Sequence, residues 1–545
     1  MLARHAARVR SRRALLAGVA RGLGVTLLVA LLAAPLAAAW GIGQAEVQDY
    51  LGPHRATFSA TFSGEMKIDL GPLGNAYLPS PAGPVGVEVR VGGVGPSAES
   101  VGSLFSEATL AAYLSLYQEP RLAVEAILDR LELDALLNGL GAEALLLGAF
   151  AVWRLRSQLL SPWVARHVTR RRSVVVYLAV LGLVAGSVLS PRPPAPDRIP
   201  VTLAADPRLQ DLTVDSVVLA NLLDRGIKGV TLLSRRQQRA VDTYVDTAVA
   251  DLSRQVGRLP RPAPGESMLL GFSDLHCNQA MTELISRLAA ATAPRIVLSA
   301  GDDTVNGTAV EKTCIRREAA IGGDTPFVAV TGNHDSDVTE AQMRGDGIVV
   351  LDGSAVEQAG LQLLGDDDPE HNVPFSVQRN LERPETEEQL GARMLQTGAA
   401  DPVDVLLVHQ PTAAAVLMAD PNPPARLVAW GHLHREQGPT VVTHEDGSWT
   451  VGMQQGTAGG VRQPTITSFS TPFSPPLISA DVYFYYRDDA TGLVTGVQPV
   501  HVTPDARVVI DPRRATGDLD ALPPQTRLRL TGATPAPTAT PAPSR

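Results

Sequence analysis

The C-terminal part of the chain lacks the excess of positive charge that a nucleic-acid groove needs. The 545 residues contain 47 Lys and Arg against 56 Asp and Glu, which gives a formal net charge of −9. Residues 1–200 contain 19 basic and 14 acidic side chains, so residues 201–545 contain 28 basic and 42 acidic ones and carry a net charge of −14. A surface of that sign repels a polyanion, and we therefore expect no nucleic-acid groove there.

Aromatic residues are scarce as well, at 4%, although the hydrophobic share is ordinary at 45%. A chain of this length has room for about three or four domain-sized units. The positive charge that the C-terminal part lacks is gathered near the N-terminus, in two clusters that flank apolar runs. That arrangement is typical of a membrane protein.

The first apolar run extends from Gly22 to Gly43 without a charge and follows five arginines within residues 1–13. At ~1.5 Å per residue in a helix, the run exceeds the ~30 Å of a bilayer's hydrocarbon core. Ala37-Ala38-Ala39 would also suit the cleavage site of a signal peptide. We favour a retained span because the run is longer than the ~7–15 residues of a signal peptide's apolar core.

Two further runs extend this pattern. Residues 173–190 are uncharged, whereas residues 135–153 contain Glu143 near the middle. An ionised carboxylate inside a bilayer costs on the order of 3 kcal/mol, so Glu143 should face another helix or be protonated. An amphipathic helix lying on the membrane surface is the alternative for this second run.

The charges between these runs predict the orientation of the chain. Residues 154–172 contain six arginines, and basic loops stay in the cytoplasm. A cytoplasmic N-terminus followed by three spans keeps that loop inside and places everything after Pro191 outside. Without the middle span the arginines at 170–172 would lie outside, so the charges favour about three transmembrane helices in a multi-pass protein of the cell membrane.

These observations divide the chain into segments. Residues 1–43 are the basic N-terminus and first span, and residues 44–134 are a small extracytoplasmic module that begins with strand-like alternation of valines at 85–91. The remaining segments are a second span at 135–153, a basic cytoplasmic loop at 154–172, a third span at 173–190, a Pro-rich linker and helical segment at 191–266, the main domain at 267–512 and a disordered Pro/Ala/Thr-rich tail at 513–545.

Five apolar strands of the main domain end in side chains of the kinds that bind metals. Asp274 and His276 follow the first strand and, being two residues apart, project to the same side of an extended backbone. The other endings are Gly301-Asp302, Gly332-Asn333-His334-Asp335, His409 and Gly431-His432-Leu433-His434. Each motif alone is common in turns. Five such endings in succession, with five of the eleven histidines, indicate one site at the carboxyl edge of an α/β sheet.

This ordered set of motifs resembles the calcineurin-like metallophosphoesterase superfamily. The resemblance covers about residues 267–512, less than half of the chain. It implies an α/β fold, a four-layer α/β/β/α sandwich of two mixed sheets flanked by helices, with a dinuclear metal centre at the strand ends. By the same resemblance, the first metal ion is bound by Asp274, His276 and His434, the second by Asn333, His409 and His432, and both by the bridging Asp302.

The chemistry of two neighbouring cations agrees with these assignments. Ions ~3.5–4 Å apart repel each other, so a carboxylate and a hydroxide should lie between them, and their charge lowers the pKa of bound water. The expected reaction is hydrolysis of a phosphomonoester, phosphodiester or pyrophosphate bond by attack of the metal-bound hydroxide. A ligand set of nitrogen and oxygen suits Mn, Fe or Zn, as like or mixed pairs.

His334 looks like the catalytic histidine of that family and not like a ligand. The resemblance implies that it stabilises charge or protonates the leaving oxygen, and that Asp335 orients it. Members of the family often carry a second acidic or amide residue three positions after the bridging aspartate. This chain has Val305 there, so the support of the bridge should differ.

Two loops and the two cysteines each allow more than one interpretation. Residues 365–371, with three consecutive aspartates, could face the substrate or form a solvated acidic turn. The glycine-rich residues 456–460 could approach the metals through their backbone or form a flexible turn. Cys277 and Cys314 each follow a ligand motif closely, and we favour a disulfide between them over free thiols or metal ligation.

Together these patterns predict a membrane-anchored phosphoesterase whose catalytic domain lies outside the cytoplasm. Its expected partners are a phosphate-ester substrate and the lipid bilayer, and the sequence indicates no oligomeric state. Nucleotides, and the phosphates of lipids or the cell envelope, are the two candidate groups of substrate. A non-catalytic metal-binding sensor or scaffold protein of the envelope is the alternative, but such a protein has no evident need for His334 and Asp335.

Overall fold

The computed structural model describes residues 2–51, 54–80, 83–92, 120–159, 175, 182, 197–201, 211–372, 379–381, 383–462 and 475–518. The chain forms two compact units. Unit 1 contains residues 1–104 and 124–228, and unit 2 contains residues 105–123 and 229–545.

Unit 1 contains two long apolar helices, α1 (Leu2–Gln44) and α5 (Pro120–Leu159). Leu23–Gln44 has a mean hydropathy of 2.2 and Glu125–Ala151 one of 1.4, so both are long and apolar enough to cross a bilayer. They overlap the first two expected spans. The third expected span, residues 173–190, lies outside the described residues except for 175 and 182.

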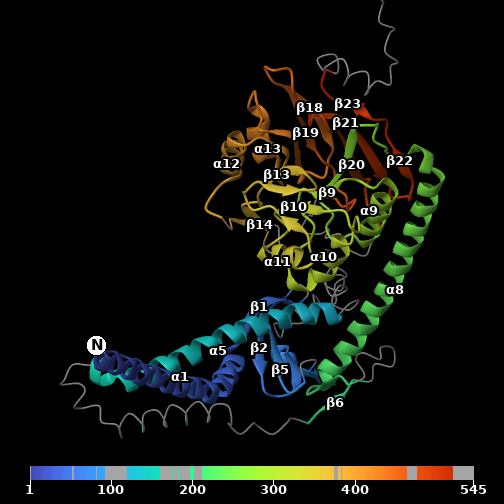
Figure 1. The fold of residues 1–545 in the computed structure, drawn as a ribbon. Coiled ribbons are helices and arrows are strands. Elements are labelled where there is room, and N and C mark those ends of the chain that lie inside the picture. The colour runs from blue at the N-terminus through green and yellow to red at the C-terminus, as the bar shows by residue number, and fades with distance from the viewer. Residues whose placement is uncertain are drawn as a thin grey trace, which may run out of the picture. The chain divides into compact units, whose positions relative to one another are not determined.

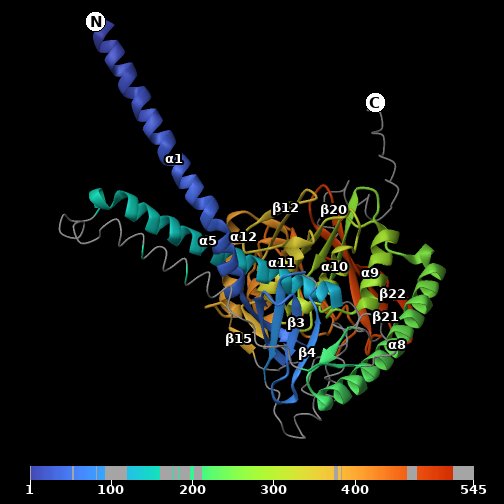
Figure 2. The same ribbon diagram turned by 90° about the horizontal axis from the view of Figure 1, so that it is seen from below.

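The two helices run in opposite directions and approach each other through small residues. Ala33, Ala37 and Gly41 recur every four residues along one face of α1 and are buried. A Cβ on Gly41 would lie 2.2 Å from Ala135 O, and one on Gly139 would lie 3.3 Å from Ala37 O. Small residues permit this close approach of two backbones. The helices meet at this seam and diverge toward their far ends (Figure 2).

The strands of unit 1 form one sheet in the order β1-β2-β5-β3-β4-β7-β6. Strand β5 (Gly86–Val91) carries the valine alternation that predicted it, with Val87, Val89 and Val91 buried. The other strands are β1 (Glu46–Leu51), β2 (His54–Thr61), β3 (Glu65–Asp69), β4 (Asn75–Pro79), β6 (Ile199–Pro200) and β7 (Thr213–Val214), with a short 3-10 helix at Gly71–Leu73. Strand β7 pairs with β4, so part of the segment that we interpreted as linker and helix belongs to this sheet.

Helix α8 (Val217–Arg254) begins in unit 1 and ends in unit 2. Near its start, Leu219 joins the small core of unit 1. Near its end, Tyr244, Ala248 and Leu252 pack into the core of unit 2. Their four-residue spacing places them on one face of the helix.

Unit 2 is built on two sheets that pack face to face, each covered by helices on its outer side (Figure 1). The larger sheet has the order β11-β10-β9-β8-β20-β21-β22, with β23 beside β21, and the smaller has the order β12-β13-β16-β17-β19-β18. Side chains such as Leu269 and Leu427 form the core between the sheets. Helices α9 to α11 cover the larger sheet and α12 and α13 the smaller. The expected α/β fold is confirmed, and the layers are α/β/β/α.

Central strands of unit 2 are buried on both faces, which explains why apolar runs predicted them. The strands of the larger sheet are β8 (Glu266–Phe272), β9 (Ile296–Ser299), β10 (Phe327–Ala329), β11 (Val349–Val350), β20 (Ala480–Asp488), β21 (Val494–Val502), β22 (Val508–Ile510) and β23 (Arg514–Ala515). Those of the smaller sheet are β12 (Val356–Gln358), β13 (Leu361–Gly365), β16 (Val403–Leu407), β17 (Ala425–Trp430), β18 (Gln437–Thr443) and β19 (Trp449–Gln454).

The helices and one hairpin complete unit 2. The helices are α9 (Gln279–Thr292), α10 (Lys312–Ala319), α11 (Asp337–Gly345), α12 (Glu387–Ala400) and α13 (Pro411–Ala419), with 3-10 turns at Val256–Arg258 and Ala309–Glu311. Strands β14 (Glu370–Asn372) and β15 (Arg379–Leu381) pair antiparallel as a separate hairpin.

Candidate metal centre

The expected ligand residues lie where parallel strands of the two sheets end. Strands β8, β9 and β10 are parallel neighbours in the larger sheet, and β16 and β17 are parallel neighbours in the smaller. The loops that follow are joined by main-chain hydrogen bonds, because Asp274 N donates to Gly301 O and Gly431 N donates to His409 O. The carboxyl ends of parallel strands thus bring all five motifs to one place.

One group of possible ligand atoms comes from Asp274, His276, Asp302 and His434, whose donor atoms all lie within 4.8 Å of one another. His434 Nε2 lies 3.2 Å from Asp274 Oδ1 and 3.1 Å from His276 Nε2. His276 Nε2 lies 3.8 Å from Asp302 Oδ2. These are the residues expected at the first metal, together with the expected bridge.

A second group comes from Asp302, His409 and His432. His409 Nε2 lies 3.3 Å from Asp302 Oδ2, and His432 Nδ1 lies 2.8 Å from Asn333 Oδ1, so the structure brings Asn333 to this group too. Asp302 belongs to both groups, with its Oδ2 facing His276 on one side and His409 on the other. That position suits a carboxylate shared by two cations.

Main-chain carbonyls set the ring tautomers of three of these histidines. In each ring Nδ1 donates to a carbonyl oxygen, which leaves the lone pair of Nε2 directed at the site. The pairs are His276 with Thr304, His434 with Val461, and His409 with Ala300, at 3.0, 2.8 and 2.8 Å. The Nε2 atoms of His276 and His434 lie 3.1 Å apart, so either a proton on one of them or a cation beside them must separate the two lone pairs. The nitrogen and oxygen atoms present therefore fit divalent metal ions.

The electrostatics of the second group also favour a cation. Burial lowers the pKa of His409, but the carboxylate of Asp302 more than offsets it and holds the pKa well above its ordinary value. Burial raises the pKa of Asp302, but the rings of His409 and His334 hold that pKa well below its ordinary value. His409 Nε2 has no aligned hydrogen-bond partner among the described residues. The site thus keeps Asp302 ionised and stabilises positive charge next to it.

The ligand loops contain strained backbone. Nine non-glycine residues of the described part have positive φ, and six of them lie in these loops, with φ between 48° and 72°. The six are Asp274, His276, Cys277, Asp302, His432 and His434. Each such residue costs on the order of 1–3 kcal/mol, and strain of this kind persists where the surrounding structure holds a side chain for function.

Gly332 and Gly431 are needed for space. A Cβ on Gly332 would lie 2.3 Å from Asp302 Oδ1, and one on Gly431 would lie 1.9 Å from Ser273 Oγ. Neither glycine has a positive φ, so a side chain here is excluded by its neighbours and not by the backbone conformation. Both glycines let a ligand loop pass directly against an aspartate loop.

The structure corrects the role expected for Asp335. Its carboxylate accepts hydrogen bonds of 2.7–3.2 Å from main-chain N–H groups and from one hydroxyl, and none of those described goes to the ring of His334. The donors are the N–H groups of Gly332, Asp302, Asp303 and Thr304 and the hydroxyl of Thr304. Asp335 follows His334 in the sequence, but its carboxylate holds the loop that carries Asp302. Three N–H groups of that loop and one of the Gly332 loop donate to it.

His334 is oriented by two groups that sequence reasoning missed. Its Nδ1 donates to Val305 O at 2.7 Å, and its Nε2 accepts from Asn372 Nδ2 at 2.8 Å. Val305 stands where the resemblance led us to expect an acidic or amide residue, and its main-chain oxygen supplies the acceptor for the His334 ring. Every residue has a main-chain carbonyl oxygen, so the sequence cannot show which one accepts from His334. Asn372 contacts His334 because of the position of strand β14, which the sequence did not predict.

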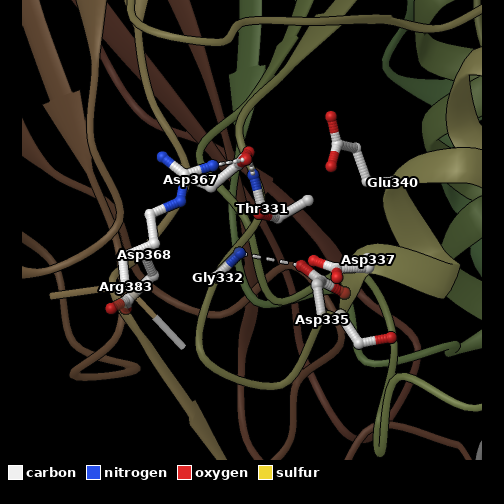
Figure 3. Close-up of a pocket in the computed structure, with 9 residues that line it drawn as sticks. Thr331, Gly332, Asp335, Asp337, Glu340, Asp367, Asp368 and Arg383 are labelled. Atoms are coloured by element: carbon white, nitrogen blue, oxygen red, sulfur yellow. Dashed lines mark hydrogen bonds and ion pairs between the residues drawn. The ribbon is translucent and has the colours of Figure 1, made fainter. Parts of the chain in front are cut away.

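The aspartates of residues 365–371 are buried, so the interpretation as a solvated acidic turn is wrong. Arg383 donates to Asp366 at 2.6 Å and to Asp367 at 2.5 Å, and Gln410 Nε2 donates to Asp368 at 2.7 Å. Burial raises the pKa of Asp367 to about 6 and that of Asp368 to about 7. Both line a pocket beside the Gly332 loop (Figure 3), with Thr331, Gly332, Asp335, Ser336, Asp337, Glu340 and Arg383.

The glycine-rich loop 456–460 stabilises the turn at Asp274 through hydrogen bonds. Ala458 N donates to Ser273 O, Gly459 N donates to Asp274 O, and the hydroxyl of Thr457 donates to Asp274 O. These residues are buried, so the loop is not a freely moving turn.

Cys277 and Cys314 form a disulfide, which confirms the favoured interpretation. The bond joins the turn after His276 to helix α10. It therefore ties one ligand loop to the body of the domain.

Three comparisons relate the chain to known proteins. Residues 268–436 match the family model for calcineurin-like phosphoesterases. No curated protein matches the chain. Among solved structures, a novel archaeal phosphodiesterase is similar at 12% identity with a TM-score of 0.24, over 45% of this chain and 99% of that one. A metallophosphoesterase from Sphaerobacter thermophilus is similar at 13% identity with a TM-score of 0.20, over 49% of this chain and 100% of that one.

The assignment to a family rests on the family model, because these structural similarities are too low to carry an argument. Proteins of this family are in general hydrolases of phosphoesters and typically bind two divalent metal ions, and the two groups of Asp and His donors that share Asp302 are able to hold them. Residues 268–436 of this chain are a domain of the calcineurin-like phosphoesterase family.

Proposed function

We propose that the chain is a membrane-anchored phosphoesterase that hydrolyses a phosphomonoester, phosphodiester or pyrophosphate bond outside the cytoplasm. The observation that carries the proposal is the pair of donor groups that share Asp302. Asp274, His276 and His434 would hold one metal ion, and Asn333, His409 and His432 the other. Bound divalent ions would supply Lewis acidity and lower the pKa of water in the site.

The chain's own residues prepare the rest of the reaction. Water attacks phosphorus as the bond from phosphorus to the leaving oxygen breaks, and the leaving oxygen gains a proton. His334 is the residue that we assign to this proton, because its ring lies against the first group, with its centroid 4.9 Å from that of His276. Burial of Asp274, Asp302 and His409 excludes water from the ligand side of the site and strengthens each electrostatic contact there.

The donor set suits Mn, Fe or Zn and does not distinguish among them. Nucleotides, and the phosphates of lipids or the cell envelope, are the substrates that we propose to test first. A membrane tether favours the second group, because it holds the domain near such phosphates.

The packing of unit 1 supports an anchor in the bilayer. Leucines on the outer faces of α1 and α5 are widely exposed, for example Leu27 at 72% and Leu145 at 77%. Water does not stabilise two such helices, whereas lipid does. The small-residue seam between α1 and α5 is also the kind of contact that holds helices together in lipid, where apolar burial supplies no driving force.

The course of the chain around the sheet of unit 1 supports an odd number of membrane crossings. Helix α5 leads away from this sheet, to which its first turns are tied by an ion pair from Arg130 to Asp49 at 2.6 Å. The chain is back on the sheet at Arg198, which donates to Glu65 at 2.7 and 2.8 Å, and at β7. A sheet cannot continue through lipid, so a chain that leaves through α5 must cross again before Arg198. Residues 160–196 contain one uncharged run of sufficient length, at 173–190.

The charges favour one orientation of the chain in the membrane. The far ends of α1 and α5 carry the arginines of residues 1–13 and Arg154 and Arg156, which favour the cytoplasm. Among the described residues the candidate spans are α1 and α5, so the phosphoesterase domain would lie on the same side as the sheet. A disulfide between Cys277 and Cys314 agrees with a compartment outside the cytoplasm.

Hydrolysis of bis-p-nitrophenyl phosphate and p-nitrophenyl phosphate by the full chain in detergent, with added Mn, tests the activity. We expect turnover that a chelator abolishes, and we expect Asp302→Asn to lose both metals and turnover. Asp505→Asn, at an exposed aspartate of the same domain, is the matched control. Metal binding without hydrolysis of any ester would contradict the proposal and favour a sensor or scaffold.

Fusions test the anchor separately. Alkaline phosphatase joined after Arg545 should be active and a fluorescent protein there should be dark, with the reverse result for fusions after Leu159. A fluorescent C-terminal fusion would contradict the three-span topology without touching the assignment of the metal site.

A further inference from the structure

The carboxylate of Glu311 is surrounded by hydrogen-bond donors of one loop. Glu311 is only 6% exposed. Its Oε1 accepts from the main-chain N–H groups of Val305 and Asn306 at 2.8 and 3.2 Å. Its Oε2 accepts from the main-chain N–H group and the hydroxyl of Thr308 at 2.8 and 2.9 Å. Main-chain N–H groups can only donate, so both oxygens act as acceptors and the loop is folded around them.

One of these hydrogen bonds fixes the peptide group between Thr304 and Val305. The N–H of Val305 and the carbonyl of Thr304 belong to the same planar group, so holding one sets the direction of the other. The carbonyl oxygen of Thr304 lies 3.0 Å from His276 Nδ1 and accepts its hydrogen. Glu311 is therefore linked to His276 through a single peptide group.

The next peptide group repeats this arrangement. It contains the N–H of Asn306, which donates to the same oxygen of Glu311, and the carbonyl of Val305, which accepts from His334 Nδ1 at 2.7 Å. The resemblance led us to expect an acidic or amide side chain at position 305. Instead, an acid six positions further along the chain holds the main chain of Val305.

A buried carboxylate in this position can act on a metal ligand that it does not touch. Histidines that bind metals usually donate their other ring N–H to a carboxylate, a main-chain carbonyl or water, which fixes the ring and raises the basicity of the ligand nitrogen. In a chain of hydrogen bonds each bond polarises the next. The carboxylate of Glu311 should therefore strengthen the hydrogen bond from His276 Nδ1 to Thr304 O, and with it the donor strength of Nε2.

We propose that Glu311 is a positioning residue of His276 and acts through the peptide group between Thr304 and Val305. The proposal rests on the metal site from which the function above was proposed. It gives the two oxygens of one carboxylate different tasks. Oε1 holds the peptide group behind His276, whereas Oε2 and Thr308 form the capping box of the 3-10 turn Ala309–Glu311.

Metal binding by the full chain in detergent tests the proposal. Calorimetric titration of the metal-free protein with Mn²⁺ should show two sites. We expect Glu311→Ala to weaken one of them about 10- to 100-fold, the usual effect of removing an outer partner of a metal ligand, and to leave the other unchanged. Glu311→Gln keeps an acceptor for the two N–H groups but lacks the charge, so it should recover part of the loss.

Thr308→Val is the matched control, because a role in capping alone would also make Glu311 important for folding. This substitution removes the hydroxyl that donates to Oε2 and leaves Oε1 with its two N–H donors. We expect it to lower the urea midpoint of unfolding and to leave both Mn²⁺ affinities unchanged.

A double substitution makes the result specific to His276. In a chain that already carries His276→Ala, the further change Glu311→Ala should not alter the remaining Mn²⁺ affinity, because the ring through which Glu311 acts is absent. A general loosening of the fold would add to the loss whether His276 is present or not.

The contrary outcomes can be told apart. Unchanged Mn²⁺ affinities in Glu311→Ala, or in Glu311→Gln if the alanine variant does not fold, would overturn the proposal, and so would equal losses with and without His276. If the wild type binds no Mn²⁺, the metal site fails and the proposal fails with it. If the wild type binds two Mn²⁺ ions but hydrolyses no ester, the proposed function fails, and the role of Glu311 is still decided by these affinities.

Discussion

Leucine has opposite surroundings in two regions of this protein. In the phosphoesterase domain Leu269 and Leu270 are completely buried, each against a different face of β8. In α1, Leu31 is 70% exposed, and the buried residues within positions 23–44, where burial is described, are Ala33, Ala37 and Gly41. Apolar residues are interior where water is the solvent, and small residues are interior where helices associate in lipid. We propose that the two regions are built for different solvents, and substitutions should then affect them in different ways.

The largest expected effect is confined to the domain. His334→Ala should lower kcat about 10²- to 10⁴-fold, because the leaving oxygen loses its proton donor. Metal content and retention in the membrane should not change. His444→Ala, at a histidine bonded to Ser448 and Thr450 away from the ligand loops, is the control. Loss of metal in His334→Ala would assign this ring to the ligands instead.

The disulfide should matter next, through stability. Cys277→Ser with Cys314→Ser opens a bridge between residues 37 apart, which should lower the free energy of unfolding by about 3–4 kcal/mol because the unfolded chain regains freedom. Urea unfolding followed by loss of hydrolytic activity measures this. An unchanged midpoint would show that the bridge does not form in the folded protein.

A charge introduced into α1 tests the comparison in the apolar helix instead of in the phosphoesterase domain. Leu31→Arg should disfavour insertion by about 3 kcal/mol, because the position lies within the apolar run, and Leu23→Arg at its end should cost much less. Extraction of membranes with alkaline carbonate measures the fraction released. In a helix surrounded by water neither arginine would destabilise the protein. Equal retention of both variants in the membrane fraction would therefore contradict the assignment of α1 to lipid.

The smallest expected effect is at the seam between the helices. Gly41→Leu should destabilise the pair by about 1–3 kcal/mol, because its Cβ would overlap Ala135 O. Gly24→Leu on the same helix is the control, since nothing lies within 4 Å of a Cβ there. Thermal melting of unit 1 in detergent measures the difference. Hydrolysis by the domain should be the same in both variants.

Several features could be predicted because they depend on local sequence. Apolar runs buried on both faces predicted β8, β9, β16 and β17, and the residues at their ends predicted the ligand groups. The expectation that Asp335 orients His334 was wrong, because adjacency in the sequence does not tell in which direction a side chain points. Its carboxylate turns back to four N–H groups, while the His334 ring points to Val305 and Asn372. A main-chain acceptor has no residue type, and Asn372 is 38 positions away.

The sequence by itself determined the chemistry of the ligands, the order of the strand endings and the apolar length of the first helices, because side-chain type and periodicity are local properties. Only the tertiary structure decided that main-chain carbonyls direct the Nε2 atoms of three ligand histidines inward, and that β7 returns to the sheet from which α5 departs. Those features depend on which segments, distant in the sequence, pack together. The free energy of that packing is distributed over many weak contacts, and no single motif encodes it.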